Sequence, residues 1–479
     1  GASATIPNAI TVTGNTATLN TAGFASTLTG IISQVGTTLT KLIVKGGNIL
    51  TMKGIISHTG GTEVQGGTTL KAGIANLFGG TNKSLSLVDS GSAFDMTVGS
   101  QVLGDLNGDA GTIINLGSNT LTFGTANDST FKGVIQGSGG KVVKQGAGTW
   151  VVSGANTYTG GTTVSAGTVQ VGNSTVIGTG TVTMAGSTTL KWGANATIAN
   201  PFTLNEVAAI NSAGFSGTLS GILSGNGGLN IVDNLSLGTV GEAANTYSGG
   251  TTLATGKTVS VYKSGALGIG TSTMVNGATL LWGTNATLAN PFALNGTSAI
   301  NSAGFSGTLS GILSGNGGLN IVDNLSLGVV GGAANTYSGG TTLAANKTVT
   351  VYKSNALGTG TVTMAGGSTL AWGSAATLAN PFALNGETTI NSSGFSATLS
   401  GILSGQGSLN IIDNLNLGTT GGVANTYSGG TTLAANKTVT VYKSSALGTG
   451  TVSMSDNTTL QFGASATIPN AITVTGNTA

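Results

Sequence analysis

The amino-acid sequence predicts an all-β fold, a parallel β-helix (β-solenoid) with essentially no α-helix. Three observations predict it: a tandem repeat of 90 residues, a hydrophobic pattern with a period of two, and short strand-forming runs separated by glycine pairs. Glycine occupies 84 positions and proline only 5, which argues against collagen and polyproline structures. The helix formers Glu, Arg and Gln are nearly absent.

The 90-residue repeat organises most of the chain. Trp192, Trp282, Trp372 and Phe462 each open the same phrase, and the strand pattern runs through these joints without a linker. We therefore expect one continuous solenoid over residues 1–479 rather than a row of sandwich domains. The expected units are two divergent ones at 1–101 and 102–191, three nearly identical ones at 192–281, 282–371 and 372–461, and the start of another at 462–479.

The local pattern within a unit alternates apolar and polar residues. The segment 347–354, KTVTVYKS, places Val349 and Val351 on one face and threonines on the other, as in a half-buried strand. At roughly 20 to 25 residues per coil, a unit gives about four coils and the chain about twenty, stacked as a rod. We expect small inward residues (Ala, Ser, Gly, Val), and Asn320, Asn324 and Asn335 at corners where side-chain amides bond the backbone.

Composition narrows the possible functions. The formal net charge is +2, charged residues make up 6% of the chain, and there is no cysteine. No basic surface for nucleic acid is expected, and no stretch approaches the ~20 apolar residues of a transmembrane helix. Thiolate metal sites and disulfides are excluded, and we expect no cofactor.

The two ends of the sequence are identical, since residues 1–17 repeat as residues 463–479. Either the sequence is a window of a longer array, or copies of the chain join head to tail. We favour the window, because solenoids grow by duplication of whole units. The second interpretation predicts self-association, end to end or lateral, and thus a self-assembling extracellular fibre.

The segment 144–171, KQGAGTWVVSGANTYTGGTTVSAGTVQV, resembles the passenger-associated repeat of autotransporter proteins. The matching positions are Lys144, Gly146, Gly148, Thr149, Ser153, Gly154, Asn156, Tyr158, Gly160, Thr162 and Gly167. The centre of this pattern returns as NTYSGGTTL at Asn245, Asn335 and Asn425. The resemblance implies a right-handed parallel β-helix passenger, exported to the outer surface of a Gram-negative bacterium. The family shares no catalytic residues, so the resemblance transfers none.

Two sets of residues are candidates for a site. Asp105, Asn107 and Asp109 have the spacing that begins a calcium loop, but Ala110 and Leu116 stand where glycine and glutamate are required, which favours an Asx-rich turn. His58, the single histidine, occupies the tyrosine place of the TYSGG phrase, and we expect it in a surface turn.

A third candidate is the recurring aspartate of the IVDN phrase, Asp233, Asp323 and Asp413. These carboxylates could form a row along the solenoid, but a spacing of about four coils is on the order of 20 Å, too far for an acid–base pair. We therefore expect corner residues that bond the backbone, and no catalytic residue.

The sequence thus predicts a structural, adhesive repeat region of an extracellular or surface protein, a rigid stalk that binds a ligand on a host or neighbouring cell. The fibre subunit is one alternative. A β-helical carbohydrate-active enzyme is another, which the 13 scattered acidic residues and the absence of arginine disfavour.

Overall fold

The computed structural model describes residues 2–36, 41–81 and 83–475. These residues form strands and turns, and none of them lies in a helix. The chain divides into two compact units, Gly1–Ser236 with Thr246–Gly249, and Leu237–Asn245 with Gly250–Ala479. Each unit is a parallel β-solenoid, and their turns number about 22, close to the twenty predicted. The boundaries of the repeat units stay a prediction.

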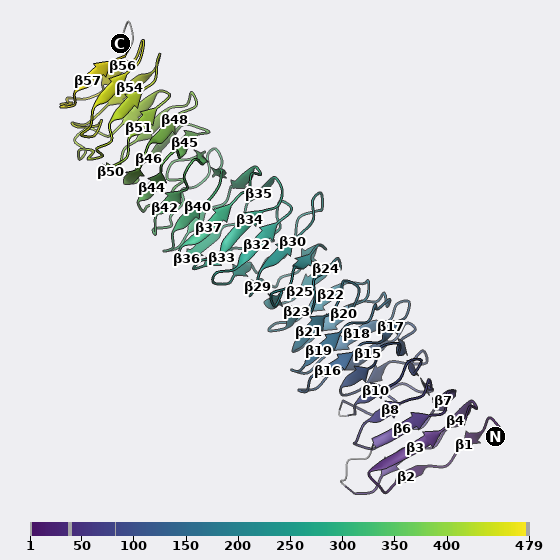
Figure 1. Ribbon diagram of the computed structural model, residues 1–479. Coiled ribbons are helices and arrows are strands. Elements are labelled where there is room, and N and C mark those ends of the chain that lie inside the picture. The colour runs from purple at the N-terminus through teal and green to yellow at the C-terminus, as the bar shows by residue number, and fades with distance from the viewer. Residues whose placement is uncertain (1, 37–40, 82, 476–479) are drawn as a thin grey trace. The chain divides into compact units, whose positions relative to one another are not determined.

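The first unit winds through three long sheets, whose strands follow one another from coil to coil (Figure 1). One sheet contains β1 (Thr5–Ile6), β4 (Ser26–Leu28), β7 (Ile49–Met52), β9 (Thr69–Ala72), β11 (Ala93–Asp95), β14 (Ile113–Asn115) and β17 (Val134–Gln136). The next contains β3 (Thr16–Asn20), β6 (Lys41–Lys45), β8 (Thr62–Val64), β10 (Leu85–Leu87), β13 (Leu106–Gly108), β16 (Ser129–Phe131), β19 (Thr149–Val152), β21 (Thr168–Val171), β23 (Thr189–Trp192), β26 (Ala208–Asn211) and β29 (Leu229–Ile231). The third contains β12 (Gln101–Val102), β15 (Thr120–Phe123), β18 (Lys141–Lys144), β20 (Thr162–Val164), β22 (Val182–Met184), β25 (Phe202–Leu204) and β28 (Leu223–Ser224). Shorter groups are β2 (Ile10–Val12) with β5 (Ile32–Gln34), and β24 (Ala196–Ile198), β27 (Gly217–Leu219) and β30 (Leu235–Leu237).

The second unit repeats this arrangement with four groups of strands. The first group is β31 (Thr251–Leu253), β33 (Ser272–Val275), β36 (Phe292–Asn295) and β39 (Leu313–Ser314). The second is β32 (Thr258–Val261), β34 (Thr279–Trp282), β37 (Ser298–Asn301), β40 (Leu319–Ile321), β42 (Thr341–Leu343), β44 (Val362–Ala365), β47 (Phe382–Asn385) and β50 (Leu403–Gly405). The third is β35 (Ala286–Leu288), β38 (Gly307–Leu309), β41 (Leu325–Leu327), β43 (Thr348–Val351), β45 (Thr369–Trp372), β48 (Thr388–Asn391), β51 (Leu409–Ile411), β53 (Thr431–Leu433), β55 (Val452–Met454) and β57 (Ile472–Val474). The fourth is β46 (Ala376–Leu378), β49 (Ala397–Leu399), β52 (Leu415–Leu417), β54 (Thr438–Val441) and β56 (Thr459–Phe462).

Neighbouring coils pair in parallel and in register. Between β19 and β21, Trp150 lies opposite Val169 and Val152 opposite Val171, so inward residues stack on inward residues. Parallel pairing of this kind requires that the paired strands alternate inward and outward side chains in the same register. The alternation read from the sequence is therefore confirmed: Val349 and Val351 of β43 are buried and Thr348 and Thr350 are not.

The interior of the coil is filled by large side chains, which corrects the expectation of small inward residues. Leucine, isoleucine and valine dominate the core, and the largest fully buried side chains are Trp150, Trp192, Trp282, Trp372, Tyr158, Tyr247, Tyr337, Tyr427, Phe78, Phe94, Phe123 and Phe131. The indole nitrogens of Trp192, Trp282 and Trp372 each donate a hydrogen bond to the carbonyl oxygen four residues later, at 2.9 to 3.0 Å. The coil is thus wide enough for an aromatic ring, which contributes a large buried apolar area.

Equivalent strands of successive repeats lie in different sheets. In the second unit Thr251, Thr341 and Thr431 open β31, β42 and β53, which belong to three different groups of strands. After β42 the chain enters the neighbouring sheet at β43 and returns to it four times, at β45, β48, β51 and β53. One 90-residue repeat therefore makes about four and a third turns, and equivalent side chains of consecutive repeats are displaced by roughly a third of a turn.

Glycine is required where two coils touch through their backbones. A Cβ atom on Gly401 would lie 1.9 Å from the carbonyl oxygen of Asn380, on the preceding coil. The equivalent Gly311 meets the Asn290 carbonyl at the same 1.9 Å. Because the obstacle is backbone, no side-chain rotation relieves it, and any larger residue must separate the coils.

We predict that Gly401→Ala destabilises the second unit by about 1 to 3 kcal/mol, because the added methyl group overpacks the contact between coils. The measurement is chemical denaturation followed by far-UV circular dichroism. Gly366→Ala is the matched control, since the nearest atom to its Cβ would be the Asn385 carbonyl oxygen at 3.6 Å, and we expect a change within about 0.5 kcal/mol. Equal effects of the two substitutions would contradict the close contact.

Candidate functional site

The asparagine and the tyrosine of the NTY phrase lie inside the solenoid, and the asparagine bonds neighbouring coils to each other. Asn335 Oδ1 accepts a hydrogen bond from Leu313 N at 3.0 Å, and its Nδ2 donates to Ala356 O at 2.6 Å. The side-chain amide thus replaces backbone partners where the chain has no strand. Asn425 repeats both bonds with Leu403 and Ala446.

The tyrosine of this phrase is also structural. Tyr337 is fully buried and its hydroxyl shares a hydrogen bond of 2.6 Å with the Thr341 hydroxyl, which donates to Leu357 O. Burial raises the pKa of Tyr337, and the bond to Thr341 opposes this only in part. Tyr158 and Tyr427 make the same contacts with Thr162 and Thr431, so this set of tyrosines packs and is closed to a ligand.

His58 takes the tyrosine place, as predicted, but not at the surface. Its side chain is fully buried, and Nε2 lies 3.5 Å from the hydroxyl of Thr62, four residues on, as in the tyrosine pairs. The expected surface turn is therefore wrong. The phrase predicts an exposed turn, whereas its aromatic position points into the core.

The recurring aspartates do not form one row. Asp323 follows β40 and Asp413 follows β51, and these strands belong to different sheets. Each carboxylate accepts a hydrogen bond from a backbone N–H of the preceding coil, Gly304 at 2.5 Å for Asp323 and Gly394 at 2.6 Å for Asp413. Asp233 does the same with Gly214 at 2.7 Å. The corner interpretation agrees with these bonds.

In two of the repeats the aspartate also forms an ion pair. Lys347 Nζ lies 2.7 Å from Asp323 Oδ1, and Lys437 Nζ lies 2.7 Å from Asp413 Oδ1. Burial alone would raise the pKa of Asp323, but the hydrogen bonds from Lys347, the backbone and Ser302 together lower it to about 2. The same contacts lower the pKa of Asp413.

The calcium candidates lie in and beside β13, and the side-chain oxygens of Asp105 and Asn107 form hydrogen bonds within the fold. Asp105 and Asn107 flank the buried Leu106 at the start of β13. Asp105 accepts hydrogen bonds from the Thr125 hydroxyl at 2.6 Å and from Asn127 Nδ2 at 3.0 Å on the next coil. Asn107 Oδ1 accepts from Thr130 N at 2.9 Å, and Asp109 is exposed. The calcium site stays a prediction, with the Asx-rich turn as the interpretation that these bonds favour.

Asparagines of the expected corners divide into two kinds. Asn324 Oδ1 accepts from Thr348 N at 2.8 Å, and Asn335 bridges three coils as described. Asn320 instead lies within β40 with its side chain outward, so its placement at a corner was wrong. Its neighbours Leu319 and Ile321 take the inward phase of the strand, which leaves the outward phase for the amide.

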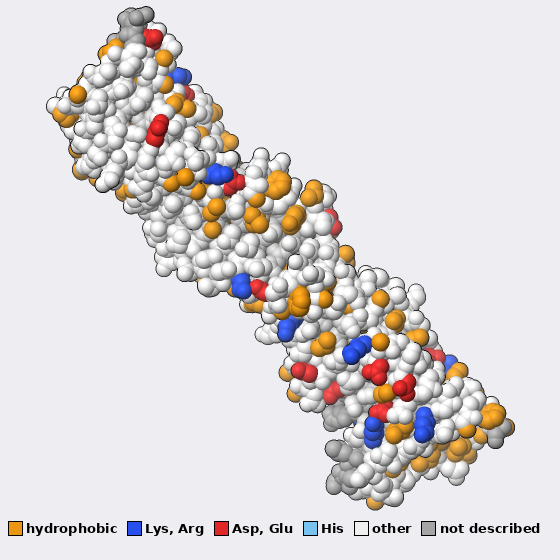
Figure 2. Space-filling view, viewed as in Figure 1, with side chains coloured by type: hydrophobic (Ala, Val, Ile, Leu, Met, Phe, Trp, Pro, Cys, Tyr) orange, Lys and Arg blue, Asp and Glu red, His pale blue; other side chains and the backbone are white. Residues whose placement is uncertain are grey.

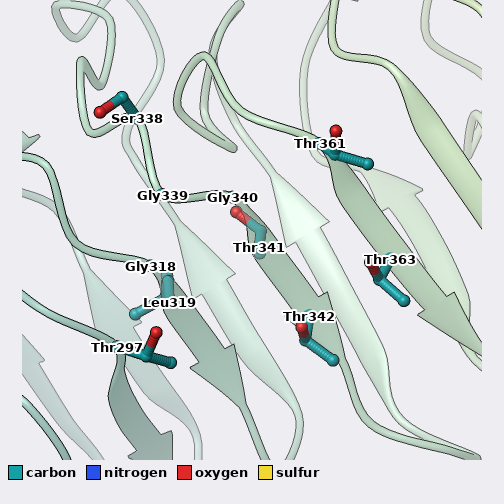
Figure 3. A pocket seen from close by; sticks show the side chains of 10 residues that line it. All are labelled: Thr297, Gly318, Leu319, Ser338, Gly339, Gly340, Thr341, Thr342, Thr361 and Thr363. Carbon is teal, nitrogen blue, oxygen red and sulfur yellow. The ribbon is translucent and has the colours of Figure 1, made fainter.

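A shallow hollow on the second unit is lined by hydroxyl groups. It has a volume of about 350 Å³, and Figure 3 shows Thr341 and Thr342 of β42 beside Thr363 of β44, below the corner at Gly339 and Gly340. Its lining contains no aromatic ring and no charged side chain. The hollow exists because the glycine corner carries no side chains, and its chemistry is limited to weak hydroxyl contacts.

Sequence reasoning missed a set of buried lysines. Lys353 follows Val349 and Val351 in the inward phase of its strand, and it is 5% exposed. Burial lowers the pKa of Lys353, Lys443 and Lys263, and the Glu242 carboxylate opposes the shift at Lys263. The signal was present in the sequence, because the period of two continues through KTVTVYK to the second lysine.

The described residues form no metal-binding cluster. Across the residues that the structure describes, no three His, Asp or Glu side chains gather so that they could hold a metal ion. The described part of the chain likewise has no helix with the length and apolarity to cross a membrane. Figure 2 shows a mostly uncharged face with few charged side chains, several of which gather toward the N-terminal end.

We predict that the Asp323 ion pair stabilises the second unit at neutral pH. The folded-state pKa lies below the unfolded value of about 3.9, so the stabilisation is present above that value and is lost as pH falls toward 2. Asp323→Asn should cost on the order of 1 to 2 kcal/mol at pH 7, after allowance for the partly exposed lysine.

Thermal denaturation of wild type and variant at pH 7 and at pH 2 measures this effect. The difference in melting temperature should shrink strongly at pH 2, where the carboxyl group is about half protonated in the folded protein and almost fully protonated in the unfolded chain. Glu387→Gln in the same unit is the control, since Glu387 is exposed, and it should leave the melting temperature nearly unchanged. A pH-independent difference for Asp323→Asn would refute the electrostatic origin.

A family model confirms the resemblance seen in the sequence. The passenger-associated transport repeat matches residues 42–72, 142–171, 239–261 and 325–345. The segment 142–171 spans β18 to β21, so one match contains strands of two successive coils. Its Lys144 is buried, and Nζ donates to the carbonyl oxygens of Gln145, Gly146 and Ala166. The motif thus contains a residue that forms a hydrogen bond from one coil to the next.

Part of the chain is similar in sequence to a curated protein. The chain is 34% identical over 170 residues to a protein described as adhesin BmaC autotransporter, from Brucella suis biovar 1 (strain 1330). This match covers 34% of the chain and only 5% of the length of that protein. No solved structure matches the chain. With the fold, the family match and this relative in agreement, the chain carries the passenger-associated transport repeats of autotransporter proteins.

Proposed function

We propose that the chain is a structural and adhesive passenger region, displayed on the outer surface of a Gram-negative bacterium. The observation that carries the proposal is that motif residues bond neighbouring coils to each other, as Asn335, Thr341 and Lys144 do. A segment in which the motif maintains the solenoid itself is suited to present surfaces rather than to perform chemistry. The similarity to an adhesin supports the same role.

The proposed role is not enzymatic. The hollows around the Thr341 corner and around Tyr352 contain no Asp or Glu side chain, whereas glycosidases require two carboxyl groups beside the scissile bond. The carboxylates of Asp323 and Asp413 are already paired with lysines and backbone N–H groups. These pairs favour the stalk over the carbohydrate-active enzyme.

We predict that display of the chain on a non-adherent Gram-negative host increases attachment to epithelial cells several-fold. The measurement counts the bacteria that are retained after washing, with surface expression verified by an antibody. The control displays the same chain with Gly311→Leu and Gly401→Leu, which force the coils apart at two backbone contacts. Attachment that is equal with and without the displayed chain would refute the adhesive role.

Self-association is a second proposal, for which the second unit offers exposed apolar side chains in equivalent places. Phe305 and Phe395 are 39% and 43% exposed, and Ile312 and Ile402 are 42% and 37% exposed. Recurrent exposed aromatic and aliphatic residues are typical of surfaces that another protein covers. Because consecutive repeats turn around the coil, these side chains face more than one direction, which suits lateral contacts between copies.

We predict a concentration-dependent increase in mass for the purified chain in analytical ultracentrifugation. The double variant Phe305→Ser with Phe395→Ser should weaken this association, since it removes exposed apolar area without touching the core. Far-UV circular dichroism verifies that the variant folds. A single monomeric species over the whole concentration range would eliminate lateral self-association.

A further inference from the structure

A second set of tyrosines, distinct from the buried ones, lies half-exposed at the end of a strand in each repeat. Tyr262, Tyr352 and Tyr442 each precede a buried lysine. The Tyr352 ring lies against the next coil, where a Cβ on Gly373 would meet its Cε1 at 2.3 Å. Glycine at this place lets the ring lie directly over the backbone. Within the described residues, the hydroxyl group of Tyr352 has no hydrogen-bond partner.

Tyr352 borders a surface hollow with a volume of about 440 Å³. The hollow is closed on one side by the loop at Val330, Gly331 and Gly332, and Lys353 lies within its lining. The ammonium group of Lys353 donates a hydrogen bond to Ala333 O. The structure places no carboxylate beside it among the described residues.

The preceding repeat shows which group can pair with this ammonium group. There Glu242 stands where Gly332 stands in the next copy, and its carboxylate lies 3.7 Å from the ammonium nitrogen of Lys263. A Cβ on Gly332 would lie 3.0 Å from Val329 O and 3.6 Å from Lys353 Cδ, so a side chain at this place would pass close to Val329 and lie beside the lysine. Glycine at 332 therefore leaves space, beside a buried ammonium group, for a carboxylate from outside the chain. A buried cation without a counter-ion costs free energy that such a carboxylate would offset.

We propose that the hollow at Tyr352 and Lys353 binds a carboxylate-bearing sugar, whose carboxylate takes the place of the Glu242 carboxylate. This inference rests on the proposed adhesive function and names its ligand class. The equivalent place in the following repeat has Gly422 beside Lys443, so the same ligand binds there. The first repeat of the series is blocked by its own glutamate.

The remaining lining favours a sugar over an acidic peptide. The half-exposed Tyr352 ring offers an apolar surface to the C–H face of a pyranose. Ser354 Oγ accepts from Thr377 N at 3.0 Å, which leaves its own hydrogen for a ligand oxygen. Asn355, which is partly exposed, adds an amide donor and acceptor to the same hollow. Polar groups close to one aromatic ring suit a saccharide, which carries hydroxyl groups around an apolar C–H face.

Isothermal titration calorimetry of the purified chain with a galacturonic acid trisaccharide tests the site. We expect two binding sites per chain for the wild type, none for Gly332→Glu with Gly422→Glu, and three for Glu242→Gly. Loss of a site means at least about tenfold weaker binding, equivalent to ~1.4 kcal/mol. Because Glu already occupies this turn in the first repeat, the double variant should fold, and circular dichroism verifies it.

Neutral and peptide probes separate the alternatives. A galactose trisaccharide should bind at least about tenfold more weakly than the acidic one. Equal binding of the neutral sugar, tighter or equal binding of triglutamate, or unchanged stoichiometry in the double variant would each overturn the proposed site.

The attachment assay distinguishes this inference from the proposed function. Bacteria that display the wild-type chain and attach, while the trisaccharide does not bind, retain the adhesive function and reject the sugar site. Binding of the trisaccharide without any attachment supports the site and rejects the adhesive function. Loss of attachment in the double variant supports both.

Discussion

The direct stacking of each coil on the preceding one, in register and at backbone contact, is the constraint on which the rest of the structure depends. Contacts such as that between Gly401 and the Asn380 carbonyl leave no space for a side chain. Once the coils are so close, inward residues must stack on inward residues, and every interruption of a strand must supply its own hydrogen-bond partners. Low charge follows, because few places inside or between coils can hold an unpaired ion.

Much of the repeated polar pattern meets this constraint. The amide of Asn335 replaces backbone partners on two neighbouring coils, and the ammonium group of Lys144 satisfies several carbonyl groups at a turn. A motif of Asn, Tyr, Thr and Lys would suggest a binding or catalytic site if read by residue type alone. Here the motif residues form hydrogen bonds that hold the coils together, as the apolar core does by packing. The positions at which the copies differ are therefore the better candidates for a binding function.

The fold could be predicted from the sequence, because the period of two and the repeat are both direct consequences of coil stacking. The same period also places Lys353 inside, since it continues the inward phase of Val349 and Val351. What the sequence could not provide was the width of the coil, and so His58 was placed at the surface instead of in the core. The sugar hollow depends on a contact across coils, between a loop and a lysine, that spacing alone does not reveal.

The length of the repeat determines how such sites are presented. If a unit contained a whole number of turns, equivalent residues would lie in one sheet, and a row of aspartates or tyrosines would face one side. Because a unit makes about four and a third turns, β31, β42 and β53 lie in different sheets, and equivalent hollows face successive sides. A surface that offers the same weak contact in several directions can engage a ligand-coated surface whichever side meets it. Several weak contacts then act together, which lets modest single-site affinities give firm attachment.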